Sequence, residues 1–236
     1  MAPDSARVVE GRFLDVLKSV FGPNLLSVMA YGSYAGGDFV PGVSDVNILI
    51  ILDRHQHDRI AQLGRQAHRL IRKHRITPLL LTRTEFRNSA DVFPMEYFDI
   101  RERHVVLYGE DETASLDLHR RHLRHQLEEH LRGTVATLRQ VLIASRGRNR
   151  AADRSMRNLF GSLRAQFRGL LRLVGADVPP DDGELIRAAE KRFGVESSPF
   201  IQLQQLRRNR KKATLELAGR VLTQLEALIR SVDANT

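Results

Sequence analysis

Apolar residues recur at regular spacing over the first part of the chain. In 5–21 four of them lie four positions apart, which predicts an amphipathic helix: Val9, Phe13, Leu17 and Phe21. The Gly22-Pro23-Asn24 sequence ends this helix. A short apolar run at 25–30 predicts a strand, and the almost entirely aliphatic segment 46–52 predicts a buried central strand.

Helical and extended patterns then alternate as far as residue 108. One helical face of 58–75 is apolar, formed by Ile60, Leu63, Ala67, Leu70 and Ile71. Segments 76–82, 95–100 and 104–108 are typical of strands, and 82–86 of the start of a short helix. Strands that alternate with helices in this way predict an α/β layer.

Beyond Gly109-Glu110-Asp111-Glu112 the pattern is helical throughout. Two long apolar stripes come first, one running through Leu123, Leu127, Leu131, Val135, Leu138 and Leu142, the other through Met156, Phe160, Leu163, Phe167, Leu170, Leu171 and Val174. A shorter helix at 184–193 and a long one at 215–229 follow. Such stripes bury against one another, so we expect a bundle of four or five helices. The predicted domains are α/β at 1–112 and all-α at 113–236.

The composition narrows the class of protein. With a formal charge of +9, the chain attracts polyanions, and nucleic acid is a possible partner, for example at the basic run 207–212. A solvated helical surface explains the same charge, and we favour it because few aromatic residues accompany the arginines. The lack of cysteine excludes thiolate catalysis and agrees with a reducing cytoplasm. The longest apolar run, 48–52, is too short to span a membrane. A homodimer is compatible with the sequence.

The segment with the clearest chemistry begins at Gly32-Ser33. A Gly-Ser pair that closes a strand and opens a helix offers N–H groups and a hydroxyl to a phosphate. Ser44, Asp45 and Asn47 then lead into the strand at 46–52. Because side chains alternate along a strand, Asp45 and Asn47 point to one face, toward the Gly-Ser turn. A phosphate cradle beside a metal-binding carboxylate is what nucleotidyl transfer from a Mg²⁺-nucleotide requires.

This pattern resembles the nucleotidyltransferase superfamily, whose signature is Gly-Ser, a spacer with glycines, and Asp-x-Asp on the next strand. The resemblance implies a mixed sheet with flanking helices, followed here by a helical bundle. It also implies that Gly32, Ser33 and Ser44 bind a nucleoside triphosphate, with ATP the first choice, and that Asp45 and Asn47 bind Mg²⁺. The implied reaction transfers AMP to a hydroxyl of a small molecule or protein that the sequence does not identify.

Two departures from the signature leave the activity open. Asn47 replaces the second aspartate, and its amide oxygen can ligate Mg²⁺ but adds no charge. The strand at 76–82 has no carboxylate, although minimal enzymes of the superfamily place a third acid there. The chain is therefore either an enzyme with a base from elsewhere or a degenerate member. The latter would bind nucleotide or a protein partner, as an antitoxin or regulator does, without transfer.

Glu96 and Asp99 are the candidate substitutes for the missing base. On a strand their odd separation points them to opposite faces, so at most one would reach Asp45. In the alternative interpretation, both lie at the edge of the sheet and pair with Arg101 or Arg103.

An arginine row marks the second long helix, where Arg164, Arg168 and Arg172 recur every four residues. Such a row can bind a triphosphate or an acidic substrate. We favour an exposed face that balances nearby acids.

Overall fold

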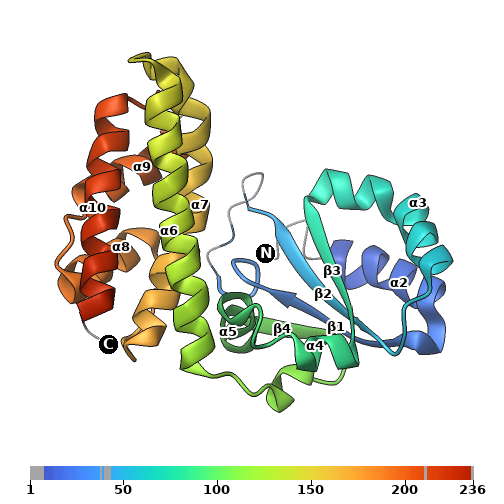
Figure 1. Cartoon of the computed structure of the whole chain (residues 1–236). Coiled ribbons are helices and arrows are strands. Elements are labelled where there is room, and N and C mark those ends of the chain that lie inside the picture. The colour runs from blue at the N-terminus through green and yellow to red at the C-terminus, as the bar shows by residue number, and fades with distance from the viewer. Residues whose placement is uncertain (1–7, 38, 40–43, 210–211, 235–236) are drawn as a thin grey trace. The chain divides into compact units, whose positions relative to one another are not determined.

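The computed structural model of the chain describes residues 8–37, 39, 44–209 and 212–234 (Figure 1). The chain divides into two compact units, Met1–His119 and Arg120–Thr236. Among the described residues, no helix is both long and apolar enough to cross a membrane.

A mixed four-stranded sheet forms the centre of the first unit. Its order is β3 (Ile76–Thr82), β2 (Val46–Leu52), β1 (Leu25–Tyr31) and β4 (His104–Gly109). β1 pairs antiparallel with β2 and β4, whereas β2 and β3 are parallel. The strands predicted at 46–52 and 76–82 have the observed bounds. The predicted class, a mixed sheet with flanking helices followed by an all-α region, is confirmed.

Two helices cover one face of the sheet. The chain enters through a π-helix, Val9–Phe13, that continues into α2 (Leu14–Phe21), while α3 (His57–His74) follows β2. Their apolar sides bury the even-numbered side chains of β2, which are Val46, Ile48, Ile50 and Leu52. The apolar residues that lie at helical spacing in 9–21 and 58–75 are thus the ones that pack on the sheet.

On the other face lie α4 (Arg83–Asn88) and α5 (Pro94–Glu102), which cover Met29, Leu49 and Ile51 (Figure 1). The prediction of a strand at 95–100 is wrong, because these residues form α5. Pro94 occupies the first turn of the helix, where a proline is well tolerated. Most of the helix is buried, and Tyr97 stacks on Phe86 with ring centroids 5.0 Å apart. A short apolar run of this kind does not distinguish a buried helix from a strand.

Gly109 closes the sheet at the end of β4. Its φ is +76°, and a Cβ there would lie 1.9 Å from the carbonyl oxygen of Leu26. Gly109→Ala should therefore lower the free energy of unfolding by about 2–4 kcal/mol, through left-handed strain and a clash with backbone. In α3, Gly64→Ala meets nothing within 4 Å and should be stabilising by up to about 1 kcal/mol. Urea unfolding of both variants tests the pair, and an equal effect would contradict the structure at Gly109.

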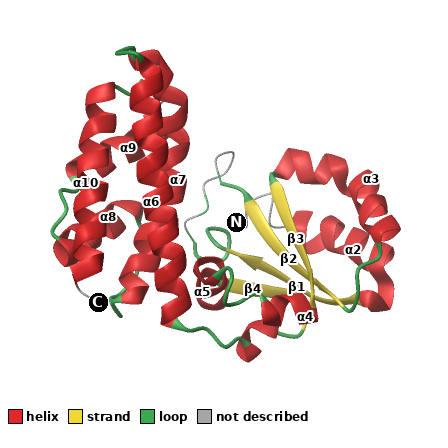
Figure 2. Cartoon of the chain, in the orientation of Figure 1, coloured by secondary structure: helices red, strands yellow, loops and turns green. Residues whose placement is uncertain are grey.

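The described residues of the second unit form five helices, and Figure 2 shows this unit as helices joined by loops. They are α6 (Arg120–Ser145), α7 (Asn149–Leu173), α8 (Asp182–Phe193), α9 (Ser198–Asn209) and α10 (Leu215–Ala234). α6 packs on α7 and α10, and both predicted stripes contribute to the core. Helix α9 was not predicted, although its buried Phe200, Leu203 and Leu206 lie at helical spacing. The side chains of most of the basic run 207–212 lie outside the described residues.

Arg168 and Arg172 of the α7 row are buried and Arg164 is partly buried, so the prediction of an exposed face is wrong. Arg168 and Arg172 are 3% and 8% exposed, respectively. Arg164 pairs with Asp182 at 2.7 Å, and Arg168 donates to the carbonyl oxygen of Pro180 at 3.3 Å. The row thus joins α7 to the start of α8, because buried guanidinium groups must find acceptors.

Candidate active site

The Gly-Ser sequence forms a turn at the end of β1. Residues 32–37 are a series of turns, so the prediction that Gly32-Ser33 opens a helix is wrong. Gly32 has φ +74°, and its N–H donates to the carbonyl oxygen of Arg103 at 3.1 Å. That N–H is therefore engaged, and a phosphate here would bind the Ser33 hydroxyl and other groups of the turn.

Tyr34 connects the turn to the π-helix Val9–Phe13 through a hydrogen bond. Its ring meets Phe39 edge-on at 5.8 Å, and its hydroxyl donates to Glu10 at 3.4 Å. Burial, followed by the charge of Glu10, raises the pKa of Tyr34 to about 12. The phenol is therefore protonated, and remains a hydrogen-bond donor, at physiological pH.

Asn47 lies directly against this turn. A Cβ on Gly32 would be 3.2 Å from Asn47 Nδ2, so only a glycine fits without displacing the amide. In the β1–β2 ladder Asn47 is opposite Tyr31, and both side chains belong to the face that α5 covers. The Gly-Ser turn and the start of β2 therefore converge at one end of the sheet.

Asp45 precedes β2, and its carboxylate contacts an arginine that the sequence did not indicate. Arg75 Nη2 lies 2.7 Å from Asp45 Oδ1, with both side chains about half exposed, at 48% and 50%. Arg75 ends α3 in a left-handed conformation, with φ 52° and ψ 40°. That conformation costs a residue with a Cβ on the order of 1–2 kcal/mol. The register partner of Asn47 on β3 is Thr77, so a threonine stands beside Asn47 on the strand where minimal enzymes of the superfamily carry a third acid.

The two carboxylates of α5 lie on the same face of the sheet as Asn47. Because Glu96 and Asp99 are three residues apart on a helix, they are neighbours on its surface. The prediction that they point to opposite faces assumed a strand and is wrong. Burial, then the charges of Glu96 and Asp99, raise the pKa of Tyr31 to about 12. Both carboxylates therefore act electrostatically on Tyr31, the register partner of Asn47.

Two further arginines flank this region. Arg101 lies over the ring of Phe98 at 5.0 Å. The guanidinium of Arg103 packs on the turn so closely that a Cβ on Gly36 would overlap it, 1.6 Å from Nη2. Tyr31 and Arg75 were missed from the sequence, whereas Arg103 was expected only as a partner of Glu96 or Asp99 at the edge of the sheet. Only Tyr31 had a local signal, since it directly precedes Gly32 at the end of a strand.

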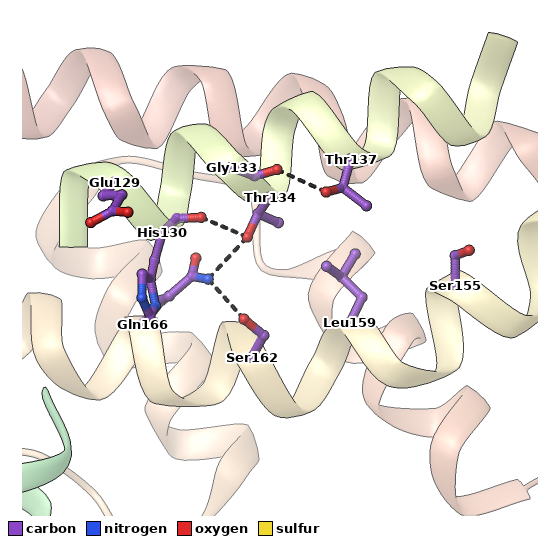
Figure 3. A pocket seen from close by; sticks show the side chains of 9 residues that line it. All are labelled: Glu129, His130, Gly133, Thr134, Thr137, Ser155, Leu159, Ser162 and Gln166. Atoms are coloured by element: carbon purple, nitrogen blue, oxygen red, sulfur yellow. Dashed lines mark hydrogen bonds between the residues drawn. The ribbon is translucent and has the colours of Figure 1, made fainter. Parts of the chain in front are cut away.

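The second unit has a polar groove of about 590 Å³ between α6 and α7 (Figure 3). Gln166 Nε2 donates to Thr134 Oγ1 and Ser162 Oγ, both at 3.0 Å. The Thr134 hydroxyl in turn donates to the carbonyl oxygen of His130 at 2.8 Å. Hydrogen bonds among the side chains of Thr134, Ser162 and Gln166 thus join α6 to α7 in this groove.

Comparisons with known proteins find a family model that matches part of the sequence and a solved structure that matches the fold. Residues 11–107 match the family model of the nucleotidyltransferase domain. No curated protein matches the sequence significantly. The crystal structure of a spectinomycin adenyltransferase from Enterococcus faecialis, with ATP and spectinomycin, matches with a TM-score of 0.63 at 11% identity. The match covers 95% of this chain and 98% of that one, and it shows a shared fold. Residues 11–107 of the first unit are therefore a nucleotidyltransferase domain, and this domain belongs to the nucleotidyltransferase superfamily.

Proposed function

We propose that the protein transfers a nucleoside monophosphate, AMP from ATP in the first instance, to a hydroxyl of a small molecule or protein. The observation that carries this proposal is the convergence of three elements at one end of the sheet. These are the Gly32-Ser33 turn, the Asp45–Asn47 segment, and the α5 carboxylates beside Tyr31. The nucleotidyltransferase domain supports the reaction class, and the ATP in the matched adenyltransferase structure supports the choice of nucleotide.

The donor set fits a single Mg²⁺ that arrives with the nucleotide. Mg²⁺ in proteins is commonly held by one or two carboxylates together with substrate phosphates. Asp45 offers a carboxylate and Asn47 an amide oxygen, and these two would hold the ion. Within the described residues, no group of three or more His, Asp or Glu side chains could hold a metal, so a preformed two-metal site is not expected. When bound, the ion would stabilise negative charge that develops on the phosphates.

In the proposed reaction, Ser33 and the turn hold the triphosphate while the acceptor hydroxyl attacks the α-phosphorus. A new oxygen–phosphorus bond forms, the bond between the α- and β-phosphates breaks, and pyrophosphate leaves. Glu96 or Asp99 accepts the proton of the attacking hydroxyl as general base. Tyr31, kept protonated by burial and by these carboxylates, would donate a hydrogen bond beside them. The lack of cysteine fits action in a reducing cytoplasm.

A second candidate function is nucleotide binding without transfer, in a regulatory or antitoxin-like protein. Three observations favour it: the neutral Asn47, the pairing of Asp45 with Arg75, and Thr77 in place of an acid on β3. The experiment that separates the two functions uses nucleoside triphosphates labelled at either the α- or the γ-phosphate. Each is incubated with Mg²⁺ and fractionated extracts as the source of acceptor. Transfer of the α-label with release of pyrophosphate supports the enzyme, whereas binding without transfer supports the second candidate.

Asn47→Asp adds the charge that the signature normally carries. We expect this variant to lower the Mg²⁺ concentration for half-maximal transfer about tenfold, because a second carboxylate binds the ion directly. The measurement is a Mg²⁺ titration of transfer at fixed nucleotide concentration. Asn88→Asp, which adds one negative charge at an exposed position of α4 outside the proposed site, is the matched control. An unchanged Mg²⁺ requirement in Asn47→Asp would remove Asn47 from the metal site.

A further inference from the structure

We propose that Arg75 is an exchangeable cation of the nucleotide site. It holds the Asp45 carboxylate while the site is empty, and it moves to the phosphates of the nucleotide when a metal ion takes Asp45. This inference rests on the proposed function, because it assumes that nucleotide and metal bind at Gly32-Ser33 and Asp45.

The backbone fixes Arg75 beside Asp45. β2 and β3 are parallel and in register, with Val46 opposite Ile76, so the residues before them are also adjacent. The N–H of Val46 donates to the carbonyl oxygen of Arg75 at 2.9 Å, and the N–H of Arg75 donates to that of Ile71. Backbone hydrogen bonds thus hold the residues just before β2 and β3 in place, and the side chains of Asp45 and Arg75 meet at 2.7 Å.

The backbone conformation of Arg75 indicates that its side chain has a role. Helices commonly end with a left-handed residue, but that residue is usually glycine or, less often, asparagine. At Arg75 an arginine adopts this conformation, with φ 52°. Glycine would adopt this conformation without strain, so the fold itself gains nothing from an arginine here. Strained residues cluster at functional sites, and Arg75 lies beside Asp45, the candidate metal ligand.

The charges around Arg75 favour an anion. Residues 59–75 include no acidic side chain, and a surface groove of about 490 Å³ on α3 is lined by His68, Arg69, Arg72 and Lys73. A guanidinium group also matches the geometry of phosphate oxygens. Because Asn47 is neutral, Asp45 provides the single negative charge of the Asp45–Asn47 segment. Arg75 and a metal ion must therefore compete for the Asp45 carboxylate. Both partners are half exposed, which makes the exchange easy.

Two binding measurements on the full chain test the proposal, with Mn²⁺ alone and with ATP in a buffer containing saturating Mg²⁺. Arg75→Gln should bind Mn²⁺ about fivefold more tightly than the parent, because a competitor for Asp45 is removed. It should bind ATP about tenfold more weakly, because a phosphate contact is lost. Arg75→Gly should show the same two changes. Because glycine adopts the positive φ without strain, this variant should fold stably and serves as a control for loss of stability in Arg75→Gln. Arg65→Gln removes one charge from an exposed position of α3 and should change both affinities less than about twofold.

Each outcome has a defined meaning. If Mn²⁺ binds the parent and both Arg75 variants equally, or if Arg65→Gln reproduces their changes, the proposal is overturned. An effect in Arg75→Gln that is absent in Arg75→Gly would show that loss of the guanidinium group alone does not cause the change, and would also overturn the proposal. If the parent does not bind ATP in the presence of Mg²⁺, the proposed function fails. The Mn²⁺ measurement still decides whether Arg75 competes for Asp45 in that case.

Discussion

Asp45→Ala is expected to lower the rate of nucleotidyl transfer by about a thousandfold. Asp45 is the one carboxylate of the Asp45–Asn47 segment, in which Asn47 lies against the Gly-Ser turn, so its loss removes the charge that would hold the metal against the phosphates. The measurement is release of pyrophosphate and transfer of the α-label at saturating nucleotide. The effect should be in the chemical step, with a smaller change in nucleotide affinity.

Asp53→Ala is the matched control for Asp45→Ala. Asp53 follows the other end of β2, is exposed, and donates its backbone N–H to the carbonyl oxygen of Asn24, a bond that alanine keeps. Transfer in Asp53→Ala should stay within about twofold of the parent. Equal and measurable activity in Asp45→Ala and the parent would show that the reaction occurs elsewhere on the protein.

The second large effect is expected from α5. Either Glu96→Gln or Asp99→Asn should lower transfer about 10²- to 10⁴-fold, since each removes a candidate base but keeps the shape of the side chain. The other variant should have a much smaller effect, because one proton needs one acceptor. A pH–rate profile identifies the base, since its replacement removes the fall in rate at acidic pH.

Glu102→Gln provides the control for these two variants, because Glu102 is an exposed carboxylate in the last turn of the same helix. Its rate and pH profile should match those of the parent. If both Glu96→Gln and Asp99→Asn retain parental rates, the α5 carboxylates are not the base. The second candidate function, binding without transfer, would then gain support.

The central strands could be predicted because their signal is local. The aliphatic residues of β2 are buried on both faces by helices, which gives a continuous apolar run that needs no tertiary information. Helix α5 has the opposite character. Its Tyr97, Phe98 and Ile100 are typical of strands, and the turn of helix that Pro94 begins is stabilised by packing on Phe86. Tertiary contacts here override local propensity.

The site was only partly predictable for a related reason. Gly32, Ser33, Asp45 and Asn47 lie within one recognisable segment, so their proximity could be expected from the sequence. The contact of Arg75 with Asp45 depends on the parallel register of β2 and β3, which no local pattern encodes. The placement of Glu96 and Asp99 beside Tyr31 likewise required α5 to be a helix. Contacts between distant segments become visible only once the topology is known.

The most direct test of the central claim is a crystal structure with Mn²⁺ and a non-hydrolysable nucleoside triphosphate. The claim is that Gly32-Ser33 and Asp45–Asn47 form one pocket for a metal-bound nucleotide. It predicts an anomalous Mn²⁺ peak within about 2.5 Å of an Asp45 oxygen, with phosphate oxygens in contact with Ser33. A nucleotide bound away from the Gly32–Gly37 turn, or a metal ion distant from Asp45, would contradict it.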